Sequence, residues 1–459
     1  MKKRNRLARA AALLVKRVEN SFHSVARDSA VVLAGHGAQL GLGLISSAIL
    51  ARALGAEGLS LFAVVGAATA MAGTVADFGL RVGAIRYIAP ASGATDRGVA
   101  QAQETAAAYA RWKLVGSVLL TLLVLLAARP LALLLGLPPQ AGPGLLRLGA
   151  LAMLATLLSG LVGTLLHALR RFGALTLAQT ANAALTVLLM GALWLAGRLD
   201  VGQALLVGGM TAGVAALLGY AMAPAAWRRA LRRSVPLGGA HSRRLLSFSR
   251  WLWVSNILSI AAVQLDIVLL NQWLAPAAVG IYALARNLAF KADIVNQTLH
   301  TVLLPQVSGL EGRGDYVAYA RRTLGRGLLL GALMVLALPL ARPFIVFVYG
   351  SEFAPSAPLF YALMAVVLLD LLASPLVLLA LPLNRPRLLA ASDGVQVLLL
   401  VAVGAAAIPL WGAYGAVLAR FIARAGGILV TTAPILRQLR RGAAPAADSA
   451  AAPAPRDPT

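Results

Sequence analysis

Apolar stretches of about 20 residues recur along most of this chain, separated by short polar segments. A helix rises about 1.5 Å per residue, so such a stretch can cross a hydrocarbon core of roughly 30 Å. Pro138, Gly142 and Pro276 are among the turn-forming residues between the stretches. The pattern predicts twelve membrane-spanning helices, near residues 30–51, 59–79, 114–136, 144–168, 174–197, 202–222, 251–273, 279–304, 325–348, 358–381, 388–409 and 413–434.

The chain also contains an internal repeat. The segment ILARALGAEGLSLFAVV near residue 50 and the segment VLLNQWLAPAAVGIYALA near residue 268 both read as an apolar helix, a short turn and a second apolar helix. Duplicated membrane bundles of this kind enclose a cavity between their halves. We therefore expect an all-α integral membrane protein with two six-helix lobes around a central cavity. Its predicted parts are a basic amphipathic segment on the membrane surface (1–27), an N-lobe (28–222), a cytoplasmic linker (223–250), a C-lobe (251–436) and a disordered cytoplasmic tail (437–459).

Composition supports this reading and excludes several others. Apolar residues make up 59% of the chain, charged residues only 12%, and the mean hydropathy is +0.80, whereas soluble proteins carry roughly 25% charge. The net charge of +25 does not indicate nucleic-acid binding, because the Arg residues lie between apolar stretches. The sequence has no Cys, no Walker A or HExxH motif and only five scattered His. We expect no catalytic residue, metal site or cofactor.

The positive charges predict the orientation in the membrane. Cytoplasmic loops are rich in Lys and Arg. Here the basic clusters fall on alternate loops, in the N-terminal segment, in the loop of Arg111 and Lys113, at Arg170 and Arg171, throughout the central linker and after the last span. The opposite loops hold scattered residues such as Arg52, Arg198 and Arg342. We therefore expect both termini to be cytoplasmic.

The eighth predicted span carries the densest group of polar residues. At 100° per residue, Arg286, Asp293, Gln297 and His300 lie on one stripe of the helix. Ionisable groups inside a membrane usually face a cavity or a partner. The stripe predicts a cavity wall, and the alternative is a structural Arg286–Asp293 pair. Two further candidates for the cavity are Asn296 beside the stripe and Lys291 on the far side.

Three other spans contribute candidates. In the second span, Asp77 and Arg81 form an i, i+4 pair, which fits a structural ion pair as well as a cavity role. Arg420 and Arg424 are one turn apart in the last span, where they line either the cavity or a lobe interior. The seventh span adds Asn256, Gln264 and Asp266, of which Asp266 is close enough to the outer end to lie at the interface. Weaker candidates are Asp370, Asp393 and Gln396.

Three segments carry a family resemblance. They are ILARALGAEGLSLFAV with ADFGL, then VQLDIVLLNQWLAPAAVGIYALA with LLPQVS, and finally FVYGSEFAPSAPLF. In this order and with twelve spans, they resemble the polysaccharide flippases of the multidrug/oligosaccharidyl-lipid/polysaccharide exporter superfamily, over roughly residues 25–435. The segment IYALARNLAF is also similar to lipid II flippases, in which the matching Arg, here Arg286, projects into the cavity. Ser46 and Ser47 stand where those relatives carry an Arg-Asp pair, which favours a lipid-linked saccharide other than lipid II.

The resemblance implies a flippase of the bacterial inner membrane. It would move an undecaprenyl-diphosphate-linked oligosaccharide across the lipid bilayer by alternating access, for O-antigen, capsule or exopolysaccharide biosynthesis, with polysaccharide polymerases as partners. A net cationic cavity suits a diphosphate. The alternatives are a cation-coupled multidrug exporter of the same superfamily and a membrane-embedded glycosyltransferase or polymerase. The sequence carries no signal for the sugar, the oligomeric state or a coupling ion such as Na⁺ or H⁺.

Overall fold

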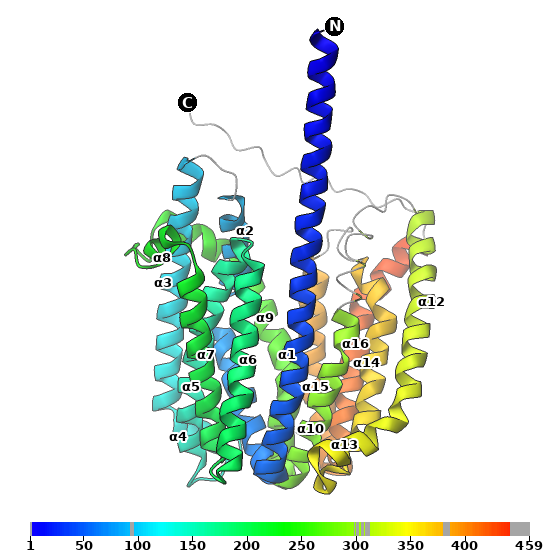
Figure 1. Ribbon diagram of the computed structural model, residues 1–459. Coiled ribbons are helices and arrows are strands. Elements are labelled where there is room, and N and C mark those ends of the chain that lie inside the picture. The colour runs from blue at the N-terminus through cyan, green and yellow to red at the C-terminus, as the bar shows by residue number, and fades with distance from the viewer. Residues whose placement is uncertain are drawn as a thin grey trace. The chain divides into compact units, whose positions relative to one another are not determined.

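The computed structural model describes residues 2–91, 96–297, 313–379 and 386–440, together with Leu299, Leu303 and Val307; before Val32 only the backbone is described. Every regular element in these ranges is helical (Figure 1). The α-helices of the first part of the chain are α1 (Lys2–Ala76), α2 (Leu80–Ile88), α3 (Asp96–Leu126), α4 (Ala128–Leu134), α5 (Gly142–Ala168), α6 (Phe172–Leu195), α7 (Val201–Met222), α8 (Ala225–Leu231) and α9 (Ala240–Trp273). Those that follow are α10 (Pro276–Ala292), α12 (Arg313–Ala337), α13 (Ala341–Tyr349), α14 (Ser356–Leu378), α15 (Pro386–Trp411) and α16 (Ala413–Arg440), and three short 3₁₀ helices are η1 (Ala89–Ala91), η2 (Leu338–Leu340) and η3 (Ser351–Phe353).

The chain divides into two compact units, Met1–Ile257 and Leu258–Thr459, which we call unit 1 and unit 2. The division falls inside α9, a helix that begins within the predicted linker (223–250) and continues into the predicted seventh span. Within the predicted tail, residues 437–440 continue α16 and the part from residue 441 onward lies outside the described residues. The predicted N-terminal segment belongs to α1, which begins at Lys2.

Ten helical stretches in the described residues are long and apolar enough to cross a membrane. The first, Val32–Ala76, contains two of the predicted spans, because the backbone leaves the helical region at Gly55 (φ 64°, ψ −175°). The predicted eighth span is absent from the ten since α10 has only 17 residues and ends at Ala292. An all-helical membrane protein is confirmed, whereas the count of twelve spans and the two lobes stay predictions.

The predicted third span begins earlier than its hydropathy indicated. It was expected at 114–136, with Lys113 in a cytoplasmic loop, but α3 already begins at Asp96 and buries Lys113 (3% exposed). Thr105, Tyr109, Lys113 and Ser117 recur every four residues on α3 and are all buried. This face packs against other helices of unit 1 and meets neither lipid nor water. The helix therefore includes polar residues that a hydropathy pattern does not assign to a span.

A break in the helix follows Ala76 in unit 1. Phe78 (φ 48°) and Gly79 (φ 64°) both adopt left-handed backbone conformations between α1 and α2. A Cβ on Gly79 would lie 2.8 Å from the backbone nitrogen of Trp253 and 2.9 Å from the carbonyl oxygen of Ser249. Only glycine therefore fits here. The Trp253 indole holds the break by donating to the carbonyl of Val75 at 3.0 Å.

Unit 1 is a bundle in which α5 packs on α3 and α7, and α6 packs on α1 and α7. One large buried cluster gathers apolar side chains from α2, α3 and α5, including Leu80, Tyr109 and Leu165. The Asp200 carboxylate caps α7 by accepting from the backbone N–H of Gln203 at 2.7 Å.

Unit 2 is built around α14 and α16, with α10 and α12 against α14, and α15 against α16. The approach of α15 to α16 is very close at Gly415, where an added Cβ would lie 2.2 Å from the carbonyl oxygen of Ala407. Small residues allow membrane helices to approach one another in this way. Unit 2 thus depends on glycine at this helix pair.

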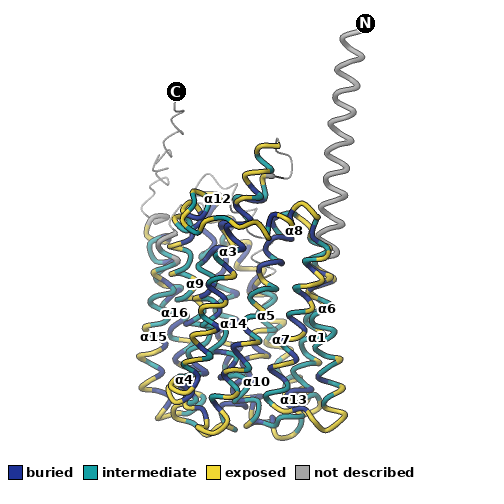
Figure 2. The backbone as a smooth tube through the Cα atoms, turned by 90° about the vertical axis from the view of Figure 1, so that its left-hand side faces the viewer, coloured by how far each residue is buried: buried dark blue, intermediate teal, exposed yellow. Residues whose placement is uncertain are grey.

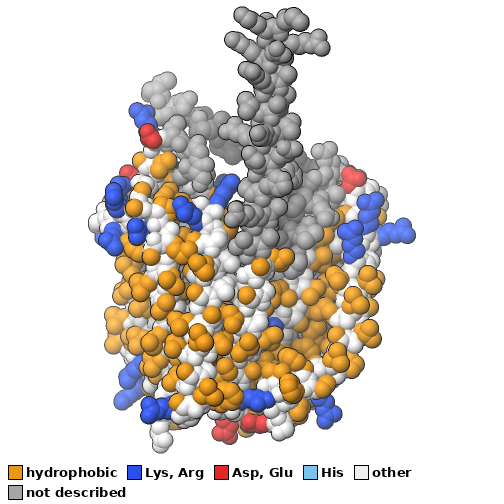
Figure 3. All heavy atoms as spheres, viewed as in Figure 1, with side chains coloured by type: hydrophobic (Ala, Val, Ile, Leu, Met, Phe, Trp, Pro, Cys, Tyr) orange, Lys and Arg blue, Asp and Glu red, His pale blue; other side chains and the backbone are white. Residues whose placement is uncertain are grey.

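The outer surfaces of both units are apolar. Leu126, Leu195, Leu336 and Phe347 are each at least 76% exposed. Figure 2 shows exposed and half-exposed residues along most of the helices, and in Figure 3 these surfaces are largely hydrophobic, with Lys and Arg near the helix ends. Exposed apolar surface of this extent suits lipid as the surrounding solvent.

We predict that Gly415→Ala lowers the thermal stability of the protein in detergent, because the new methyl group overlaps backbone atoms of Ala407. Overpacking of this kind costs about 1–3 kcal/mol. Gly325→Ala is the matched control, since nothing lies within 4 Å of a Cβ at that helical position. Equal melting temperatures for the two variants in a fluorescence-monitored melt would contradict the close packing of α15 and α16.

Candidate functional site

The most deeply buried charges of unit 2 meet at Asp266 on α9. Its side chain is fully buried and lies between two arginines, Arg286 of α10 and Arg420 of α16. Arg420 donates to Asp266 Oδ2 from Nη2 at 2.6 Å and from Nε at 3.0 Å, and Arg286 Nε lies 3.5 Å from the same oxygen. Tyr282 donates its hydroxyl to Oδ2 at 2.6 Å. One carboxylate thus brings three helices together.

The two arginines are also held by neutral groups. The carbonyl oxygen of Val263 accepts from both guanidinium groups, and Gln264 Oε1 accepts from Arg286 Nη2 at 2.8 Å. Phe290 presents its ring 4.6 Å from the Arg286 guanidinium carbon and 5.4 Å from that of Arg420. The Arg286 Nε–H is buried without a hydrogen-bond acceptor. Two guanidinium groups on one carboxylate leave a net charge of +1.

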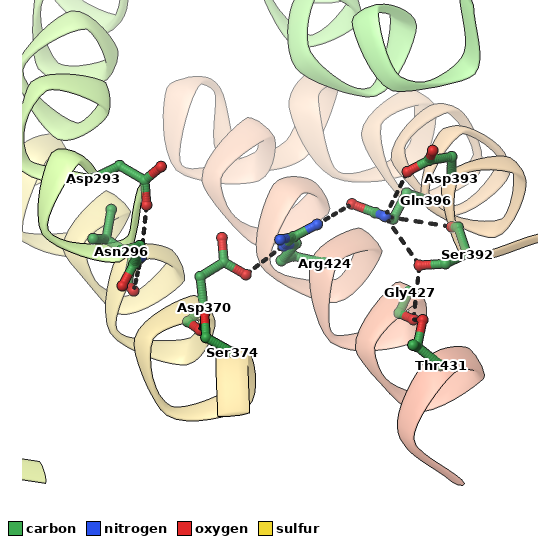
Figure 4. A network of polar contacts seen from close by, with 11 residues as sticks. Asp293, Asn296, Asp370, Ser374, Ser392, Asp393, Gln396, Arg424, Gly427 and Thr431 are labelled. Atoms are coloured by element: carbon green, nitrogen blue, oxygen red, sulfur yellow. Dashed lines mark hydrogen bonds and ion pairs between the residues drawn. The ribbon is translucent and has the colours of Figure 1, made fainter. Parts of the chain in front are cut away.

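A second polar network joins α14, α15 and α16 (Figure 4). Arg424 forms an ion pair with Asp370 through Nε and donates from Nη1 to Gln396 Oε1 at 3.1 Å. Gln396 in turn donates to Ser392 Oγ at 3.3 Å and to Asp393 Oδ1 at 3.5 Å. The Arg424 side chain is 40% exposed, so this pair is far more open than the one at Asp266.

Asp293 lies in a turn directly after α10. Its Oδ1 accepts from Asn296 Nδ2 at 2.6 Å, and the same amide donates to the carbonyl of Val367 at 3.1 Å. Arg286 takes Asp266 as its carboxylate instead of the Asp293 that the sequence suggested. The reason is tertiary: α9 brings Asp266 against α10, whereas the helix that was expected to carry both residues ends at Ala292.

Both networks open onto one cavity of about 290 Å³ within unit 2. Its charged lining is Arg286, Arg420, Arg424, Asp293, Asp370 and Asp393. Three arginines face three aspartates, so this cavity is balanced in charge, unlike the net cationic cavity that the sequence count suggested. Two of the three negative charges are Asp370 and Asp393, which were weak candidates in the sequence, and Arg81 and Lys291 do not line this cavity. The cationic character is local to the arginine pair around Asp266.

The predicted polar pair of unit 1 has a different partner. Asp77, at the helix break, forms an ion pair with Lys113 of α3, while Arg81 of α2 is exposed. Lys113 lay outside the sequence prediction because it was assigned to a loop. Its four-residue spacing to Tyr109 and Ser117 was the available signal. Tyr109 and Ser117 bury hydroxyl oxygens that have no hydrogen-bond partner.

The remaining predicted residues are dispersed. Lys291 donates to Asn287 Oδ1 of its own helix at 2.5 Å, Gln297 is exposed, and Asn256 is exposed in unit 1. His300 lies outside the described residues. The structure therefore gathers Arg286, Asp266 and Arg420 in one network, and Asp293 and Arg424 in the lining of the same cavity. It places Gln264 of the predicted seventh span beside Arg286, and it adds Tyr282 and Phe290, which no charge pattern would have indicated.

Comparison with solved structures identifies the fold. The chain is similar to an inward-facing multidrug resistance MATE family transporter of the MOP superfamily (TM-score 0.68, 16% identity, 88% of this chain and 96% of that chain). It is likewise similar to the lipid II flippase MurJ in an inward closed conformation (TM-score 0.70, 12% identity, 89% of each chain). An outward-facing MATE family transporter also matches (TM-score 0.55, 14% identity, 91% and 96%). These likenesses show a shared fold.

Sequence comparison gives the family. A search of curated proteins gives no significant match. The family model described as polysaccharide biosynthesis protein matches residues 25–311, which is more than half of the chain. The resemblance drawn from the sequence motifs is confirmed, and the chain belongs to the family of polysaccharide biosynthesis proteins.

Proposed function

We propose that this protein is a flippase that carries an undecaprenyl-diphosphate-linked oligosaccharide from the cytoplasmic to the outer leaflet of the bacterial inner membrane. The transported material would serve O-antigen, capsule or exopolysaccharide assembly, with polysaccharide polymerases as partners downstream. Membership of the polysaccharide biosynthesis family and the fold shared with the lipid II flippase support this proposal. The observation that carries it is the arginine pair on Asp266, which lines a cavity inside a membrane protein.

A diphosphate loses its hydration when it enters hydrocarbon, and the loss must be offset by fixed donors and positive charge. Guanidinium groups suit this role because their planar fork binds phosphate oxygens in pairs. Asp266 holds Arg286 and Arg420 in place through ion pairs with both guanidinium groups. We assign substrate contact to Arg286, with Arg420 beside it, and a positioning role to Asp266.

We further propose twelve spans in two six-helix lobes that expose a central cavity to each leaflet in turn. The kink of α1 at Gly55 and the short α10 account for the two spans beyond the ten found. Solved relatives with this fold are described as inward-facing and outward-facing, which supports alternating access. A coupling ion such as Na⁺ or H⁺ would bias this exchange.

A multidrug exporter of the same superfamily is the second candidate. The observation that favours it is the presence of Asp293, Asp370 and Asp393 in the cavity lining, since carboxylates suit cationic drugs. Deletion of the gene separates the two functions: loss of surface polysaccharide supports the flippase, and increased sensitivity to cationic drugs with normal polysaccharide supports the exporter.

We predict that reporter fusions at Arg243 and at Ser351 lie on opposite sides of the membrane. Arg243 belongs to the Arg-rich linker region at the start of α9, and Ser351 begins η3, in a segment expected to be external. Paired alkaline phosphatase and fluorescent protein fusions measure the two sides. Signals from the same side would contradict the proposed topology.

We predict that Arg286→Ala abolishes surface polysaccharide while the protein still inserts and accumulates, because the cavity loses its phosphate-binding fork. Arg286→Lys should recover only part of the activity, since an ammonium offers a point charge. Arg420→Ala should reduce export less than Arg286→Ala. Arg342→Ala, an exposed position outside the cavity, is the matched control. Wild-type polysaccharide from Arg286→Ala at equal expression would refute the assignment.

We predict that Asp266→Asn destabilises the protein by about 3–5 kcal/mol, the usual result of removing one partner of a buried ion pair. The two arginines would then face one another without a carboxylate. In Asp266→Asn/Arg420→Gln the net charge returns to +1, so thermal melts should show the double variant to be more stable than Asp266→Asn alone. A double variant that is less stable than the single one would exclude Asp266 as the group that neutralises the pair.

A further inference from the structure

The cavity of unit 2 is lined by polar side chains in addition to the arginine pair of Arg286 and Arg420. Beside that pair it is lined by Asp293, Asp370, Asp393 and Gln396, which come from the end of α10 and from α14 and α15. Figure 4 shows these side chains in a row, with Asp370 and Gln396 on either side of Arg424. We call these four lining residues the acceptor group.

The acceptor group is poorly suited to the diphosphate itself. Arg424 is already engaged by Asp370 and by Gln396, so it adds little positive charge to the cavity. Carboxylates would repel phosphate oxygens in a medium of low dielectric constant. A ligand that fills the whole cavity must therefore combine an anion, for the arginine pair, with hydrogen-bond donors, for the acceptor group.

Sugar hydroxyl groups meet this requirement. An ionised carboxylate has only acceptor sites, and hydrogen bonds to it are stronger than those between neutral groups. The side-chain oxygen of Asn296, whose amide binds Asp293, is a further buried acceptor without a partner in the structure, and Asn296 is only 4% exposed. This oxygen adds one more acceptor to those of the three carboxylates.

The size of the cavity agrees with such a ligand. Its volume of about 290 Å³ corresponds to roughly ten water molecules at about 30 Å³ each. A bare cation would fill only a small part of this space. A single sugar ring with one phosphate group is of the same order as the cavity, whereas a whole oligosaccharide is much larger.

We propose that the acceptor group is a carbohydrate subsite, which binds hydroxyl groups of the sugar attached directly to the diphosphate. This inference rests on the proposed function, and it assigns sugar selectivity to Asp293, Asp370, Asp393 and Gln396. The arginine pair then holds the phosphate that every such lipid shares, and the acceptor group distinguishes one linked sugar from another. Sites built to bind a hydroxyl group discriminate strongly against ligands that lack it.

The test compares two probes on the purified full-length protein in detergent. One probe is undecaprenyl diphosphate without sugar, and the other is the lipid-linked saccharide isolated from cells that lack this transporter. The wild-type protein should bind the saccharide at least tenfold more tightly than the bare diphosphate. Asp293→Asn, which keeps the shape of the side chain, should reduce this preference to threefold or less, with binding of the bare diphosphate changed less than twofold.

Two control variants separate the possible failures. Asp315→Asn, in the first turn of α12 and outside the cavity lining, should leave both affinities unchanged, while Arg286→Ala should weaken both. If the wild-type protein binds neither probe, the proposed function itself fails. If it binds both probes equally, or if Asp293→Asn keeps the full preference, the carbohydrate subsite is refuted. If Asp293→Asn changes only the Na⁺ dependence of binding, the acceptor group is a cation site and the subsite is likewise refuted.

Discussion

The buried carboxylate of Asp266 is the contact on which the polar interior of unit 2 depends. It is fully buried, accepts from Tyr282 and Arg420, and balances the charge of Arg286. A guanidinium group buried without an anion would cost several kcal/mol. The carboxylate therefore allows two arginines to be held inside a helical bundle in lipid. Since Asp266 belongs to α9 and its partners come from α10 and α16, the same group also sets how these three helices meet.

Both the apolar surface and the polar interior of this protein follow from lipid as the surrounding solvent. In lipid, the helices satisfy their own backbone groups and expose leucine and phenylalanine outward. Polar side chains then gather inside each unit, as Lys113 does on α3 and Arg424 does on α16. Apolar residues in these positions would avoid the desolvation cost of buried charges. Charged residues kept inside a membrane protein despite this cost therefore point to a function.

Some of the site could be inferred from residue type and spacing. Arg286, Asp293 and Arg420 were recognised because a charge in the middle of an apolar span needs a partner or a cavity. Their pairing was not recognised. Helical spacing suggested Asp293 for Arg286, whereas the structure supplies Asp266, which lies 20 positions earlier in the chain on another helix. Periodicity describes one helix at a time and contains no information about which helices become neighbours.

The sequence by itself determined the class of protein, most of its helical spans and its family, because hydropathy and motif order act locally along the chain. The tertiary structure alone decided which charges meet, where α3 begins and that Asp370 and Asp393 line the same cavity as Arg286. These features depend on helix packing, and packing joins residues far apart in sequence. The charge balance of the cavity is therefore a property of the folded unit and cannot be counted from individual spans.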